Sequence, residues 1–98
     1  MTDLSVLKEE MNFFKNVSYE DSAFSIDRLL NRPILSPSSI QLLPTPIQNN
    51  VTSIFLLAES LKKYDGSLDR NDKIGFVCEI NQLAKKSIDE MFSKKAND

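Results

Sequence analysis

The chain has 98 residues, of which 41% are apolar and 27% charged, and twelve basic and fourteen acidic side chains give it a net charge of −2 at pH 7. A chain of this length forms one domain, and its interspersed charges leave no basic surface for nucleic acid or anionic lipid. Histidine is absent and cysteine occurs once, which excludes an internal disulfide and a cysteine metal cluster.

Two amphipathic helices are predicted at the start of the chain. In the first, at about 3–15, Leu4, Leu7, Met11 and Phe14 recur at three- and four-residue spacing. The second is expected at about 19–31, after a weak capping residue at Ser18, and it must stop before Pro33. Its apolar stripe is made of Tyr19, Ala23, Ile26 and Leu30.

Residues 33–58 carry no charged side chain, and all four prolines of the chain lie within this window. The prolines preclude a long helix, so residues 33–45 are expected to be irregular, with about one helical turn at 37–42. Ser36 and Thr45 each precede a proline, and both are predicted to cap a helix. Ser-Pro and Thr-Pro are also minimal proline-directed sites, which makes Ser36 and Thr45 candidate phosphorylation sites.

The third helix, at about 46–64, is predicted to be the central element of the fold. Its apolar stripe runs through Ile47, Val51, Ile54, Phe55, Ala58 and Leu61. Leu56 and Leu57 widen the stripe until much of the helix is apolar, and Phe55 is expected in the core. Gly66 then suits the position just after a helix end.

The fourth helix is predicted at about 71–93, forming an antiparallel hairpin with the third. Ser67, Asp69 and Asn71 are alternative caps for its start, and Cys78 is expected to be a buried, unreactive thiol. Gly75 disfavours the helix, so either a neighbouring backbone approaches it closely or the helix begins later.

No catalytic, cofactor-binding or metal-binding residues are predicted. The acidic turn at 65–72 has Arg70 where a calcium loop needs glycine and Phe76 where it needs a bidentate glutamate. The carboxylates lie on charged helix faces with nothing to orient them, and the serines lack a base partner. A ligand carrier would need polar groups converging in an apolar pocket, and none can be nominated.

The sequence therefore predicts an all-α fold: a single domain, 1–98, built as a small helical bundle of about four helices with a proline-broken, uncharged segment between the second and third. We expect a non-enzymatic adaptor or complex subunit that binds another protein rather than its own copy, through the uncharged segment 33–58. The alternative is a small regulatory inhibitor that sequesters a larger enzyme or factor. The chain begins without a signal-peptide pattern, so an intracellular, cytoplasmic or nuclear, location away from membranes is expected. The predicted partner-binding residues are Ile34, Leu35, Ile40, Leu42 and Leu43. The segment that holds them is expected either to cap the bundle or to dock on the partner.

Overall fold

The computed structural model of the chain describes residues 4–96, with side chains described for 5–91. The elements in chain order are α1 (Leu4–Asn16), α2 (Ile26–Leu30), the 3-10 helix η1 (Pro33–Leu35), α3 (Pro37–Ile40), α4 (Thr45–Lys63) and α5 (Arg70–Ala96). No strand occurs among the described residues, so the predicted all-α fold is confirmed. Three long helices carry it, because α2 and α3 have only five and four residues.

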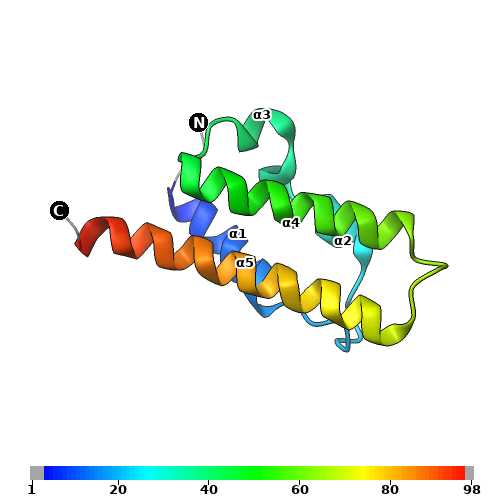
Figure 1. Ribbon diagram of the computed structural model, residues 1–98. Helices are drawn as coiled ribbons and strands as arrows, with labels where there is room; N and C mark the ends of the chain where they lie inside the picture. The colour runs from blue at the N-terminus through cyan, green and yellow to red at the C-terminus, as the bar shows by residue number, and fades with distance from the viewer. Residues whose placement is uncertain (1–3, 97–98) are drawn as a thin grey trace.

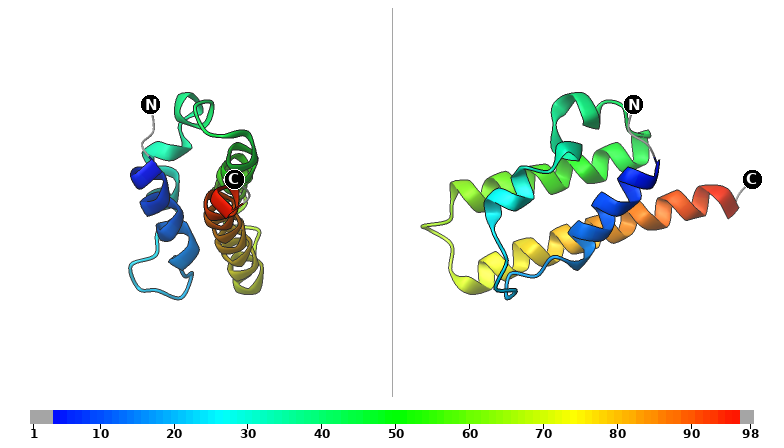
Figure 2. Two further views of the ribbon diagram at one scale, coloured as in Figure 1. Left: turned by 90° about the vertical axis from the view of Figure 1, so that its left-hand side faces the viewer. Right: turned by 180° about the vertical axis from the view of Figure 1, so that it is seen from behind.

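The helices form two layers. Helices α4 and α5 lie side by side as the predicted antiparallel hairpin, α1 packs on α5, and α2, α3 and η1 pack on α4. Figure 1 shows α4 and α5 in front, and Figure 2 shows from behind and end-on that α1 and α2 lie on the other side of this pair. One face of the hairpin is therefore covered, and no other described element covers the opposite face, which we call the outer face.

The hydrophobic core lies between the two layers. Helix α4 supplies five of its buried side chains, which agrees with the predicted central position of this helix. Phe55, by contrast, is only partly buried at the edge of the core, and its predicted place in the centre is wrong. The buried apolar residues of the three long helices are Leu7, Met11, Phe14, Ile47, Val51, Ile54, Ala58, Leu61, Val77, Ile80 and Ala84.

The second helix is much shorter than the predicted span 19–31, because α2 begins only at Ile26. Local hydrogen bonds compete with the helix in this segment. The Ser18 hydroxyl accepts from the Glu20 amide at 3.2 Å, and the Asp21 carboxylate accepts from the Ala23 amide at 2.9 Å. These contacts replace the expected helical turns with a loop at 17–25.

Asn81 on α5 ties the end of α1 to the hairpin. Its side-chain nitrogen donates to the carbonyl oxygens of Phe14 at 2.6 Å and Val17 at 3.0 Å. The last carbonyls of a helix have no partner within the helix, so Asn81 satisfies groups that would otherwise lack one.

The start of α5 agrees with one of the three predicted caps. The Asp69 carboxylate accepts from the Asp72 amide at 2.8 Å, and the Asp72 carboxylate accepts from the Asp69 amide at 3.4 Å. This reciprocal pair resembles a capping box. Gly66 lies in the turn just after α4, two residues beyond the C-cap Tyr64, as predicted, and its φ is not positive.

Gly75 lies inside α5, and neither predicted explanation for it holds. The helix starts five residues earlier, and a Cβ added at Gly75 would meet no atom within 4 Å. Gly75→Ala is therefore expected to raise the free energy of unfolding by about 1 kcal/mol through helix propensity. Urea unfolding measures this gain, and a loss of stability would show that the site has no room for a methyl group.

One ion pair lies largely inside the fold. Arg32 binds the Glu10 carboxylate with two hydrogen bonds, one of them from Nε at 3.0 Å, and its guanidinium lies 4.1 Å from the centre of the Phe13 ring. The Glu10 and Arg32 side chains are 11% and 30% exposed. The pair thus fastens α1 to the segment that follows α2.

Arg32→Ala is expected to lower the free energy of unfolding by about 1–3 kcal/mol, since it leaves the Glu10 carboxylate without its partner. Urea unfolding provides the measurement. Lys62→Ala is the matched control because it breaks an exposed pair with Asp27, and it should cost less than about 1 kcal/mol. Equal losses in the two variants would contradict a special role for the Glu10 pair.

Candidate protein-binding surface

Four of the five predicted partner-binding residues belong to the chain's own core. Ile34, Leu35, Ile40 and Leu43 are between 2% and 9% exposed, whereas Leu42 is 60% exposed. Ile34 and Leu35 lie in η1, Ile40 in α3, and Leu43 in the turn that leads to α4. Both η1 and α3 contact α4. The prediction that these four residues present a surface to a partner is therefore wrong, because they are packed in the core of the bundle. Leu42 alone of the five remains accessible.

The two predicted caps behave differently. Ser36 accepts a hydrogen bond from the Ser39 amide at 3.3 Å at the start of α3, as predicted. Thr45 is the first residue of α4 and forms no capping bond, because Pro44 occupies the cap position. The prediction that Thr45 caps a helix is therefore wrong.

Ser36→Ala should lower the free energy of unfolding by about 0.5–2 kcal/mol through loss of its cap. Thr45→Ala should leave it within about 0.5 kcal/mol of wild type, because the side chain is exposed and makes no capping bond. Thermal and urea unfolding of the two variants compare them directly. Equal destabilisation would show that the Ser36 hydrogen bond is not the cause.

Phosphorylation at these residues stays a prediction. The Ser36 hydroxyl is half-buried and donates to the Ser39 hydroxyl at 2.9 Å, so a phosphate would disrupt this cap. Thr45 is exposed in the first turn of α4, where free amides and the helix dipole favour an added negative charge. Of the two, Thr45 is the more accessible candidate.

The outer face carries an exposed leucine in the middle of α4. Leu56 is 54% exposed, and Ser53 and Ser60 lie one turn to either side of it. Leu56 was predicted to belong to a widened apolar stripe of the core, and its exposed position was not predicted. Helical geometry could have predicted it, because Leu56 lies about 200° around the helix from Ile54, on the face opposite the buried stripe.

A hollow of about 690 Å³ lies between Leu56 and the end of α4. Leu30 and Phe55 supply apolar surface, and Tyr64, which is 48% exposed, closes the end. Its charged residues are Glu59, Lys62 and Lys63. The lining thus carries charges of both signs, and the positive charge of Lys62 is partly neutralised because Lys62 pairs with Asp27 at 3.0 Å.

Two further hollows follow the seam between α4 and α5, with volumes of about 330 and 490 Å³. Both are lined by Leu57 and Glu79, so they adjoin, and together we call them the seam groove. Leu57, Leu68, Phe76 and Leu83 give the groove its partly buried apolar lining. Leu56 lines both the seam groove and the 690 Å³ hollow, and it therefore stands between them.

The basic residues near the start of α5 are engaged away from the seam groove. Arg70 pairs with Glu20 and Lys73 with Asp65, both at 2.9 Å. The hydrogen bond to Asp65 raises the pKa of Lys73 above its usual 10.5, and nearby Tyr19 acts in the same direction, while partial desolvation opposes both. A raised pKa means that this contribution to stability is complete below about pH 10.5 and is lost as the pH rises through the pKa of the folded protein.

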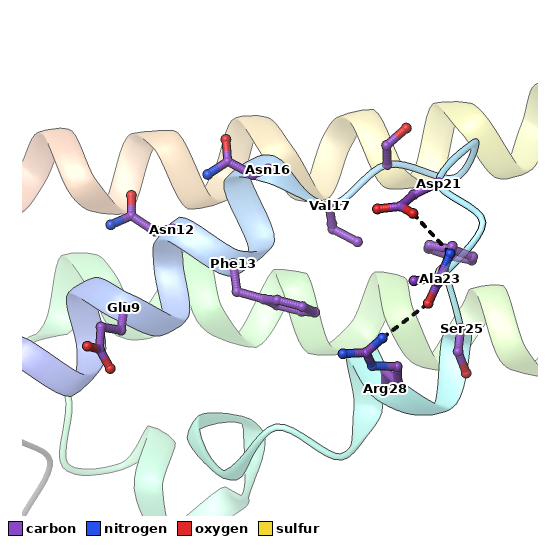
Figure 3. A pocket seen from close by; sticks show the side chains of 11 residues that line it. Glu9, Asn12, Phe13, Asn16, Val17, Asp21, Ala23, Ser25 and Arg28 are labelled. Carbon is purple, nitrogen blue, oxygen red and sulfur yellow. Dashed lines mark hydrogen bonds between the residues drawn. The ribbon is translucent and has the colours of Figure 1, made fainter.

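A hollow of about 440 Å³ lies on the other side of the molecule, between α1, the loop at 17–25 and α2. Figure 3 shows Phe13 projecting from α1 into it, with Arg28 directed at Ala23. Arg28 donates to the Ala23 carbonyl oxygen at 3.3 Å. The polar groups at Ala23 therefore hold the loop in place and do not converge on a ligand position.

Cys78 is exposed on α5, and the prediction that it is buried is wrong. It follows the buried Val77 directly and so lies about 100° further around the helix. Among the described residues, no group of three histidine, cysteine, aspartate or glutamate side chains could hold a metal ion.

Comparisons with known proteins give no family assignment: no family model matches the chain, and no curated protein or solved structure matches it. No helix in the described part of the chain is both long enough and apolar enough to cross a membrane.

Proposed function

We propose that the protein is a non-enzymatic interaction module, a small helical adaptor or subunit of a larger complex, which binds another protein through the outer face of α4 and α5. The observation that carries the proposal is Leu56, which is 54% exposed on α4 opposite its buried stripe, between the seam groove and the hollow that reaches Leu30 of α2. An apolar side chain set between recesses is the arrangement that interfaces use for an anchoring contact.

The burial of the proline-broken segment supports a domain that folds without its partner. Ile34, Leu35 and Leu43 complete the core from within the chain, and no buried side-chain nitrogen or oxygen of the described residues lacks a hydrogen-bond partner. An obligate subunit would instead leave a large apolar area open for its partner to cover. This observation favours an adaptor, or the alternative of a small regulatory inhibitor, since either must be stable before it binds.

The test is Leu56→Asp. The variant should keep its circular dichroism spectrum and urea midpoint, because Leu56 is at the surface, and should fail to capture proteins that the wild type recovers from its native cell. Val6→Asp is the matched control, since Val6 is 49% exposed but lies on α1, in the other layer. Unchanged capture by Leu56→Asp, or equal loss with Val6→Asp, would reject the outer face as the binding surface.

Once a captured protein is identified, its activity with and without the chain separates the two alternatives. An inhibitor should lower that activity in proportion to the fraction bound. An adaptor should leave it unchanged and recruit a further component.

A further inference from the structure

The seam groove has the length of a short helix. On α5 it is lined from Asn71 to Leu83, which corresponds to about 18 Å, or roughly three helical turns. On α4 it is lined from Ser53 to Ser60. A partner segment of about twelve helical residues would cover it from end to end.

The backbone around the groove favours a helical occupant over an extended one. Its walls are two regular helices, α4 and α5, whose amides and carbonyls are paired along their own axes. An extended peptide would find no backbone partners there, and its own polar groups would be buried unpaired. A helix brings a satisfied backbone and needs only apolar contacts with Leu57, Phe76 and Leu83.

The charge of the lining selects the partner. Asp72 and Glu79 are its charged residues, and no lysine or arginine lines either hollow. The Glu79 side chain forms no hydrogen bond or ion pair within the part of the chain that the structure describes. Glu79 and Leu83 also line the next hollow along α5, where Lys85, Lys86 and Asp89 give a surface of mixed charge. The purely acidic part of the rim is therefore confined to the first half of α5.

Gly75 is a second feature of the same rim. It lines the larger hollow and is exposed, and the space where a Cβ would lie is open. No contact among the described residues explains a glycine at this position of the helix. Glycine does permit close approach by another backbone, which a partner helix lying in the groove would make.

A second copy of the chain is a poor occupant. Two-fold pairing brings the same patch of both copies together, so each acidic rim would meet the other at Asp72 and Glu79. Like charges in contact across an interface oppose association.

We propose that the seam groove binds an amphipathic helix of another protein, with its apolar stripe between α4 and α5 and basic side chains along the flank beside Asp72 and Glu79. This inference rests on the proposed function of the outer face and adds the chemistry of the partner.

Two synthetic helical peptides of about 14 residues provide the probe. They share leucines at i, i+3, i+4 and i+7 spacing, and one carries lysines along the flank where the other carries glutamates. Fluorescence anisotropy with the full chain should show roughly three- to tenfold tighter binding of the lysine peptide. Glu79→Lys should abolish this preference, because the added positive charge offsets the remaining negative charge of Asp72. Glu90→Lys makes the same change in net charge about three turns further along α5, outside the groove lining, and should preserve it.

Gly75→Ala provides a second test, because helix propensity alone would change the stability of the variant and leave its affinity for the lysine peptide unchanged. The variant should melt about 4–8 °C higher than wild type yet bind the lysine peptide more weakly. Higher stability with unchanged affinity would overturn the close approach at Gly75.

The proposal would be overturned if wild type and Glu79→Lys showed the same preference, or if neither peptide bound. It would also be overturned if sedimentation showed that the chain dimerises through the groove. If Leu56→Asp still abolishes partner capture in that event, the outer face remains the binding surface and only the partner chemistry is rejected. If Leu56→Asp has no effect either, both proposals fall.

Discussion

Phe14→Ala is expected to lower the free energy of unfolding by about 3–5 kcal/mol, enough to unfold a domain of ordinary stability. Phe14 is fully buried, and its ring packs edge-on against Phe13 with 5.3 Å between ring centres. Truncation removes this buried surface and leaves a cavity between α1 and the hairpin. Urea unfolding monitored by circular dichroism measures the loss.

Phe55→Ala is the matched control, because it removes the same side chain from a partly buried position. Its cost should be clearly smaller, in contrast to the core-sized loss that the helical pattern alone would predict for Phe55. Equal losses in the two variants would place Phe55 in the core after all.

Leu43→Asp should unfold the protein, whereas Leu42→Asp should leave it folded. Leu43 is 6% exposed and Leu42 is 60% exposed. Loss of the leucine side chain from the core alone costs about 2–5 kcal/mol, and a buried, unpaired carboxylate adds to it. Circular dichroism and thermal unfolding of the two variants test this contrast between neighbouring residues.

A folded Leu43→Asp variant would show that the segment 33–45 is not part of the core. In the folded Leu42→Asp variant, capture of partners then reports whether this exposed leucine contributes to binding beside Leu56.

The sequence predicted the long helices well, because their periodic stripes are buried. The stripe from Ile47 to Leu61 placed α4 within one residue at each end, and α1 and the start of α5 were equally close. The failure at 19–31 has a local cause, since hydrogen bonds at Ser18 and Asp21 compete with a stripe of only four apolar residues. Periodicity does not weigh such bonds against helix formation.

The candidate surface was much harder to predict. The absence of charge in residues 33–58 is equally compatible with burial and with an interface, and the structure shows that Ile34 and Leu35 are buried. Leu56 and Cys78 were predicted to be buried but are exposed. Each lies close to a core residue in sequence but on another face of its helix. Which helix faces are covered depends on how α1 and α2 pack on the hairpin, and a single sequence does not specify that packing.

The docking of α1 on α5 joins the two ends of the chain, as the 67-residue separation between Asn81 and Phe14 makes plain. During synthesis, at roughly 5–20 residues per second, α1 must therefore wait about 3–13 s after it emerges before its partner helix exists. Throughout that interval the stripe of Leu7, Met11 and Phe14 is open to the ribosome surface and to chaperones. The hairpin of α4 and α5 closes through contacts nearer in sequence and can form as soon as both helices are made. Helix α1 is thus made before the hairpin that it packs on, and the domain can close only after α5 has been made.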